Sequence, residues 1–219
     1  MMIKKFNGNH TQSQQRLAIS AKAAQIQIDR KPNKNVTDNI ILSIKEVCKH
    51  VNCFEIEWKN GGSLKLYFNG RYEKYNCTGK LSSTGGVGTS RGFMDDGHIV
   101  LFINGNGIYF ERLIAICEDY VSDEIAVDYT ELAANVMDGS GTLFMADKLG
   151  VPMNFHPDNI EWSTAQENGL HGQMIKWLYE KTGHVYRFSA YDSYLVPIYK
   201  ANVIENLKSY CDSFLFEVR

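Results

Sequence analysis

The chain has 219 residues, of which 44% are hydrophobic and 12% aromatic, and its formal net charge is −2. This composition supports a sizeable core in one large domain or two small ones and excludes a disordered chain. No apolar run is long enough to span a bilayer, and Met1 to Asn9 lacks the apolar centre of a secretion signal, so we expect a soluble cytoplasmic protein. The five cysteines include no C-x-x-C pair, which argues against a disulfide framework or a zinc knuckle.

The N-terminal part carries two helix patterns followed by two strand patterns. Apolar residues at helical spacing predict one helix over residues 11–29 and a second over residues 39–50. Alternating apolar and charged residues predict a strand over residues 53–59, and a glycine turn leads from it to a return strand over residues 64–68. Residues 1–80 therefore form an ααββ module.

Residues 81–92 are rich in serine, threonine and glycine, which is typical of a flexible linker. A phosphate-cradling loop is the alternative interpretation, but the segment lacks the Lys-Ser/Thr ending of a nucleotide-binding P-loop. Lys80 and Arg91 flank it and are candidates to contact a nucleic-acid phosphate.

A strand-to-helix corner is predicted near residue 160. His156 to Asn159 has the residue types of a tight turn, and the β-prone residues 160–162 follow it. Ser163 and Thr164 offer a hydroxyl cap for a helix over residues 165–181. On that helix Asn168 and His171 are three residues apart and share one face.

The C-terminal residues 184–219 predict a strand and short helices. Gly183 is placed to end the long helix, residues 184–188 have strand character, and helices are expected over residues 189–199 and 203–211. Paired short helices are typical of helix-turn-helix modules. This tail is nearly neutral and lacks a cluster of Arg, Asn and Gln for reading bases, which argues against that role.

The run DNIEWSTAQENGLH resembles the final segment of the HNH endonuclease domain found in phage and intron-encoded nucleases. Upstream, GHIVLFINGNGIYFERLIAIC (residues 97–117) resembles the hairpin and arginine-containing helix of that family, with Glu111 at the position of a family histidine before Arg112. The run NVMDG (residues 135–139) resembles the family's NHxDG loop, with Val136 in place of its histidine. The resemblance covers about residues 97–181. It implies a ββα-metal domain over residues 93–183 and an α+β chain of phage or mobile-element origin, in the cytoplasm of a bacterial host.

The resemblance also implies roles for single residues. Asn135 and Asn168 would hold one divalent cation, magnesium or manganese, while Asp138 would shape the loop and Asn159 would tie it to the helix. Two neutral amides are a poor pair for magnesium, which favours carboxylate oxygens. The family's general base is the histidine that Val136 replaces.

Val136 has no atom that can accept a proton, and losing a general base costs about 100- to 10,000-fold in rate. His156 and His171 are the candidates to replace that base. A valine introduced to silence an enzyme is a further explanation, although alanine is the commoner choice.

Charge is distributed unevenly along the chain. Residues 1–110 carry fifteen Lys/Arg against eight Asp/Glu, and residues 111–170 carry two against twelve. We therefore expect either DNA binding through the basic half or a protein partner on the acidic region, and the plain alternative is a solvated acidic face.

The sequence thus favours an HNH-like protein that binds without hydrolysing its ligand. The alternative is an active, divalent-metal-dependent DNA endonuclease.

Overall fold

The computed structural model describes residues 36–89, 91–93, 97–124, 129, 132–191 and 216–217. The helix expected over residues 11–29 and the helices expected after Tyr191 lie outside these residues. The elements, in chain order, are α2 (Val36–Ser43), β1 (Ile44–Lys49), β2 (Cys53–Trp58), β3 (Ser63–Tyr67), β4 (Arg71–Tyr75), β5 (Leu81–Gly86), β6 (Val100–Ile103), β7 (Asn106–Tyr109), α3 (Phe110–Ser122), β8 (Leu132–Val136), α4 (Leu143–Leu149), the 3-10 turn η1 (Pro157–Asn159), β9 (Ile160–Thr164), α5 (Ala165–Thr182), β10 (Tyr186–Arg187) and β11 (Phe216–Glu217).

A five-stranded antiparallel sheet, ordered β1-β2-β3-β4-β5, makes up the N-terminal part of the described chain. The strands predicted over residues 53–59 and 64–68 are confirmed as β2 and β3. Their alternation places Phe54 opposite Leu66 on one face, where both side chains are fully buried. With α2, α3 and the smaller sheets, this arrangement is compatible with the α+β class.

The helix predicted over residues 39–50 is wrong in its second half. Helix α2 ends at Ser43, and the next six residues form β1, which pairs with β2. Ile44 and Val47 are three residues apart, which suits a helical stripe, but both are β-branched and can also pack on a sheet. The free edge of β2 supplies backbone hydrogen bonds that the sequence pattern does not reveal.

The linker predicted over residues 81–92 is also wrong in its first half, because that half is strand β5, paired with β4. A Cβ on Gly85 would lie 2.2 Å from the ring of Tyr72. A Cβ on Gly86, whose φ is +83°, would lie 2.0 Å from the carbonyl oxygen of Gly70. These glycines therefore allow close approach within a sheet.

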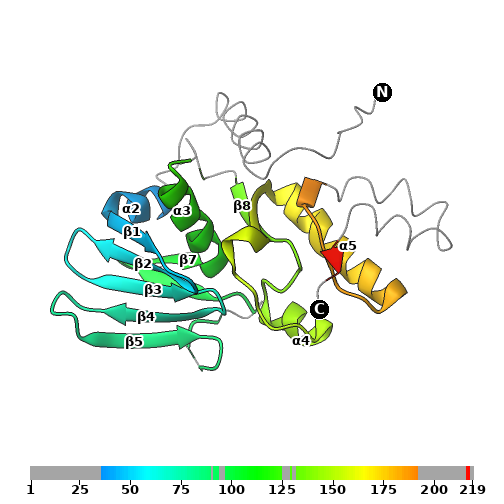
Figure 1. Ribbon diagram of the computed structural model, residues 1–219, viewed down its shortest axis with the longest axis horizontal. Helices are drawn as coiled ribbons and strands as arrows, with labels where there is room; N and C mark the ends of the chain where they lie inside the picture. The colour runs from blue at the N-terminus through cyan, green and yellow to red at the C-terminus, as the bar shows by residue number, and fades with distance from the viewer. Residues whose placement is uncertain are drawn as a thin grey trace.

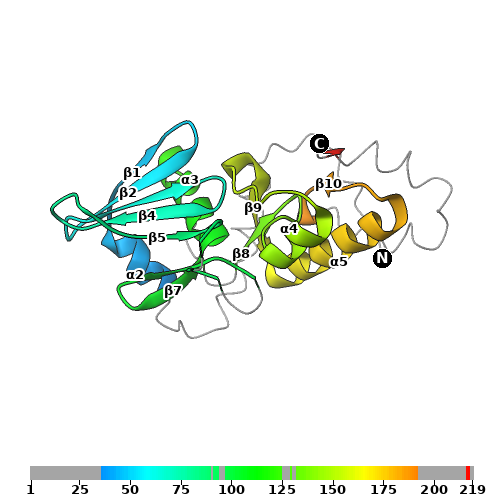
Figure 2. The same ribbon diagram turned by 90° about the horizontal axis from the view of Figure 1, so that it is seen from below.

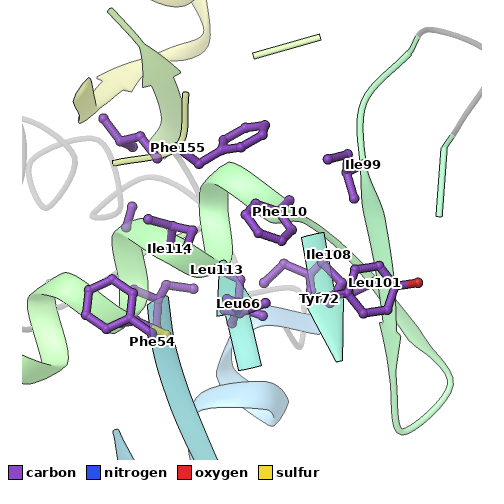
Figure 3. Packing of buried hydrophobic residues seen from close by; sticks show 14 of the residues in the cluster. Phe54, Leu66, Tyr72, Ile99, Leu101, Ile108, Phe110, Leu113, Ile114 and Phe155 are labelled. Atoms are coloured by element: carbon purple, nitrogen blue, oxygen red, sulfur yellow. The ribbon is translucent and has the colours of Figure 1, made fainter. Parts of the chain in front are cut away.

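One hydrophobic core joins the sheet to the C-terminal half. Helix α3 lies between the five-stranded sheet and the unit formed by β8, β9 and α5 (Figure 1). Leu113 of α3 is fully buried in a cluster that also contains Leu66 of the sheet, and the ring centroid of Phe110 lies 4.8 Å from that of Phe155 (Figure 3). Residues 1–80 and 93–183, expected as separate modules, thus share this core over their described parts.

A second cluster of buried side chains forms around α5 and includes Leu149 of α4 and Tyr186 of β10. Figure 2 labels these three elements in the ribbon. Gly183 ends α5 in the left-handed conformation with φ +71°, as predicted, and β10 lies within the strand expected over residues 184–188. None of the helices in the described part of the chain is long and apolar enough to cross a membrane.

Candidate functional site

The residues that resemble an HNH site lie on an antiparallel strand pair followed by a helix. Strand β8 pairs with β9 so that Asn135 lies opposite Glu161 and Val136 opposite Ile160. Helix α5 follows β9 directly. Its first turn is a capping box in which the Thr164 hydroxyl accepts from the Glu167 backbone N–H and the Glu167 carboxylate accepts from the Thr164 N–H. The predicted strand-to-helix corner is therefore confirmed.

Val136 is a core residue. It is 6% exposed and belongs to the main hydrophobic cluster. A Cβ on Gly141 would lie 2.8 Å from its Cγ2, so the Gly141 backbone closes over the side chain. The surroundings of Val136 are therefore tightly packed and apolar.

The turn after Val136 is shaped by Asp138. Its Oδ1 accepts hydrogen bonds from the Ser140 N–H at 2.9 Å and the Ser140 hydroxyl at 2.6 Å. The same hydroxyl oxygen accepts from the Asn154 N–H at 3.1 Å, which joins this turn to the loop before β9. Gly139 takes the left-handed conformation, with φ +71°. Asp138 is 1% exposed and is committed to this turn.

Asn135 is held by a buried carboxylate. Its Nδ2 donates to Glu161 Oε1 at 3.0 Å, and both residues are 2% exposed. Glu161 also accepts from the Ser189 hydroxyl at 2.7 Å and from the Ala190 N–H. Glu161 thereby joins β8 and β9 to the segment that follows β10, and the Asn135 amide is part of that junction.

Asn168 and His171 lie on α5 as expected, but in different surroundings. Asn168 is half-buried and makes no hydrogen bond with Asn135. His171 is 2% exposed, and its Nε2 lies 3.1 Å from both the Met137 and the Phe188 carbonyl oxygens. Since both neighbours are acceptors, the proton must be on Nε2. Burial lowers the pKa of His171 to about 4, so the ring is neutral at physiological pH.

His156 is the more accessible imidazole. Its side chain is 45% exposed and its Nδ1 accepts from the Asp158 N–H at 3.3 Å. The ring packs edge-on against Phe68, with centroids 5.1 Å apart. His156 and Asp138 both line a surface groove of about 480 Å³. This groove lies beside the turn that follows Val136.

The Asn159 side chain bonds to the loop before β9 and to strand β10, whereas the resemblance implies a tie to the helix. Its Nδ2 donates to the Asn154 carbonyl at 2.8 Å, and its Oδ1 accepts from Arg187 Nε at 3.1 Å. Its own carbonyl accepts from the Met137 N–H at 2.8 Å. Its partners therefore include both the loop before β9 and strand β10 after α5.

Asn135 and Asn168 do not suit a magnesium ion. One of the two amides is bound to a buried glutamate, and the pair supplies no carboxylate oxygen. Within the described ranges, no group of three or more His, Cys, Asp or Glu side chains is placed to share a metal ion. We therefore derive no hydrolytic step through a cation held by these residues.

Glu111, in the first turn of α3, is buried beside a histidine from the segment before β6. His98 Nδ1 lies 2.8 Å from Glu111 Oε1, and Glu111 is 4% exposed. The next residue, Arg112, donates to the carbonyl oxygens of Tyr129 and Leu132, and its guanidinium lies 5.7 Å from the Trp162 ring centroid. Arg112 of α3 therefore holds the backbone at and before the start of β8 in place.

Half of the acidic side chains that the structure describes in the region 111–170 are inside the molecule. Asp119, for example, accepts from the Tyr129 hydroxyl at 3.1 Å and from Trp162 Nε1 at 2.7 Å. Five acidic side chains of the region 111–170 are at most 4% exposed: Glu111, Asp119, Asp138, Glu161 and Glu167. The large negative charge of this region thus overstates the charge that a partner would meet.

Lys80 and Arg91 are both exposed but lie at opposite ends of β5. Lys80 belongs to the turn between β4 and β5, whereas the Arg91 carbonyl accepts from the Gly86 N–H at the far end of the strand. A strand of six residues is roughly 20 Å long. These two cations cannot contact the same phosphate.

Sequence reasoning missed Glu161 and His98. Glu161 was visible only as an acidic residue in a β-prone run, and its partners Ser189 and Ala190 are 28 and 29 residues away. His98 was visible only as a lone histidine before a strand. The pair Glu161-Trp162 only weakly indicates a buried carboxylate, because the sequence does not show which side chains are buried.

Comparisons with protein-family models, curated proteins and solved structures found no match for this chain.

Proposed function

We propose that this chain is an HNH-endonuclease-like protein of phage or mobile-element origin that binds nucleic acid without hydrolysing it. The observation that carries the proposal is the tight apolar packing of Val136, at the position where the family's general base would stand, within a strand-strand-helix unit. The buried, neutral His171 supports it as well, because an imidazole held between two carbonyls is not placed to activate water.

Nucleic acid is the favoured ligand class because of where the charges lie. Residues 1–35 carry seven Lys/Arg against one Asp, which is most of the basic excess of the first 110 residues. Cations of this density supply phosphate affinity that does not depend on sequence. Half of the ten acidic residues described in the region 111–170 are buried. A basic protein partner for this region therefore has less support than nucleic acid.

The second candidate is an active endonuclease that uses His156. The exposed imidazole and the groove it shares with Asp138 favour this reading, since a base must be reachable by water and substrate. For this activity a divalent cation must also be held. Asp138 could bind the cation only after it gives up its hydrogen bonds with Ser140, and otherwise the cation would bind at another place.

Two assays on the full chain test the proposal. Supercoiled plasmid is incubated with the protein and magnesium or manganese, with His156→Gln as the matched variant. Duplex binding is then measured by mobility shift between about 50 and 200 mM salt. We expect salt-sensitive binding and no nicking. Nicking that disappears in His156→Gln would establish the second candidate, and absence of binding at the lowest salt would refute nucleic acid as the ligand.

A further inference from the structure

A second hollow, away from β8, β9 and α5, lies where the five-stranded sheet meets the β6-β7 hairpin. Its volume is about 340 Å³, and Trp58, Lys74 and Phe102 line it together with the amide side chains of Asn60 and Asn76. No Asp or Glu lines this hollow. Lys74 is the charged side chain among the lining residues, so the hollow carries a local positive charge.

Lys74 is half-buried, and no acidic side chain of the described residues pairs with it. Its Nζ donates to the Phe102 carbonyl at 2.6 Å and lies 5.9 Å from the Tyr72 ring centroid. In the part of the chain that the structure describes, no carboxylate lies within 4.0 Å of it. Burial lowers the pKa of Lys74, which reflects the cost of removing an ammonium from water. An anionic ligand in the hollow would offset that cost.

Two aromatic rings give the hollow an apolar wall. Phe102 is 61% exposed, and Trp58 is half-buried. Among the described residues neither ring is paired with another aromatic ring. Trp58 packs in part against the hydrophobic core, so the exposed Phe102 ring offers the larger free surface to a ligand. Aromatic faces of this kind bind unpaired bases with little sequence preference.

Two amide groups beside the rings retain hydrogen-bond donors. Asn60 Oδ1 accepts from the Gly62 N–H at 3.3 Å, and Asn76 Oδ1 accepts from the Thr78 N–H at 3.0 Å and the Lys80 N–H at 2.9 Å. These backbone donors fix the orientation of both amides. Each Nδ2 is left with two N–H groups for the acceptors on a base edge.

We propose that this hollow binds one unpaired nucleotide of a nucleic-acid single strand. The base lies against Phe102 and Trp58, and its phosphate pairs with Lys74. Exposed Lys80, on the turn that carries Asn76, attracts the neighbouring phosphate. The inference rests on the proposed function and narrows its ligand from nucleic acid in general to strands with unpaired bases.

The test measures binding of the full chain to an oligothymidylate, to a duplex of the same length, and to thymidine monophosphate. Phe102→Ala removes the exposed ring, and Tyr109→Ala, on β7 outside the hollow and 42% exposed, is its matched control. Lys74→Gln removes the unpaired cation, with Lys45→Gln as control because Lys45 already pairs with Glu57 at 2.7 Å. Circular dichroism confirms that each variant is folded.

We expect single strands to bind more tightly than duplex. Phe102→Ala should weaken single-strand binding about tenfold, the scale of one base stack. Lys74→Gln should reduce the slope of log affinity against log salt by about 0.7, the value for one phosphate of a single strand. Both controls should leave binding unchanged.

Three results would overturn the inference in different ways. Duplex binding that equals single-strand binding and resists both variants would remove this site while leaving the proposed function intact. Monophosphate binding as tight as oligomer binding would make the hollow a pocket for free nucleotides. No binding to any nucleic acid at low salt would remove the inference and the proposed function together.

Discussion

At the scale of single residues, His171 makes folding sensitive to pH. Its pKa is about 4 in the folded chain, below its ordinary value of 6.5, because burial disfavours the charged ring. The folded state thus binds fewer protons than the unfolded state between these values. The stability it contributes is fully present above pH 6.5 and is lost as pH falls toward 4.

We therefore predict that the free energy of unfolding falls by up to roughly 3 kcal/mol between pH 7 and 4 because of His171 alone, from its pKa of about 4. Urea titrations of the parent and of His171→Gln across this range measure it, since carboxylates titrate equally in both. His184→Gln, at an exposed position, is the control. Parallel pH profiles for the parent and His171→Gln would contradict the assignment of a neutral ring.

Val136 is the residue on which the functional proposal depends, and its packing predicts the cost of restoring histidine. Val136→His would bury a larger ring with two polar nitrogens against Gly141, which leaves no spare volume. Overpacking and unpaired polar atoms together should cost about 2 kcal/mol in unfolding free energy. Val136→Thr, which replaces one methyl group with a hydroxyl at nearly the same size, should cost less. A Val136→His variant as stable as the parent would mean that this pocket admits water and a base.

At the scale of elements, α5 depends on its first turn. Thr164→Ala removes the hydroxyl that accepts from the Glu167 N–H at 3.2 Å, and we expect a loss of about 1 kcal/mol. Thr164→Ser keeps the oxygen and should retain most of the stability. Thermal unfolding of the three proteins measures the difference. Equal losses in both variants would assign the effect to the threonine methyl group instead of the cap.

Arg112 joins α3 to the start of β8 through two carbonyl oxygens and the Trp162 ring. A lysine at this position has a compact ammonium group in place of the planar guanidinium, so it can keep only some of these three interactions. We predict that Arg112→Lys costs about 1.5 to 3 kcal/mol in unfolding free energy, the range for hydrogen bonds to a charged group. Lys49→Arg, at a surface pair with Glu118, is the matched exchange and should be neutral. A neutral Arg112→Lys would show that the guanidinium geometry is unimportant.

The elements that could be predicted from sequence are those whose signals are local. The Thr164 cap, the Gly183 C-cap and the alternation in β2 and β3 each arise within a few neighbouring residues. Strands β1 and β5 could not be predicted in the same way. The first exists because β2 offers a free edge, and the second because Gly85 and Gly86 allow the backbone to approach Tyr72 and Gly70.

In the candidate site, too, some features depend on neighbouring residues and others depend on residues far apart in the sequence. The turn formed by Asp138 is local, because its hydrogen-bond partner Ser140 is only two residues away. The burial of Val136 and the capture of Asn135 by Glu161 depend on strand pairing across 26 residues. The sequence therefore indicates that Val136 cannot accept a proton. The structure adds that Val136 is packed in the core and that the neighbouring Asn135 is hydrogen-bonded to Glu161.

At the scale of the whole molecule, the burial of acidic residues and the position of the cations determine where nucleic acid would bind. The described fold uses many of its acidic residues internally, while the densest run of cations lies in residues 1–35, which carry seven Lys/Arg and one Asp. Cations of the described sheet are in part neutralised, as in the Lys45–Glu57 pair at 2.7 Å. Affinity for nucleic acid that is independent of sequence should therefore come mainly from the N-terminal residues.

This predicts a strong effect of charge removal there. The variant replaces the seven cations with glutamine: Lys4, Lys5, Arg16, Lys22, Arg30, Lys31 and Lys34. The slope of log affinity against log salt for duplex DNA should become shallower by about 0.9 for each of these cations that contacts a phosphate. Replacing Lys45 and Lys49, which pair with Glu57 and Glu118, should change the slope little. An unchanged slope in the N-terminal variant would transfer the phosphate contacts to the sheet and its turns, where Lys80 and Arg91 would be the next cations to replace.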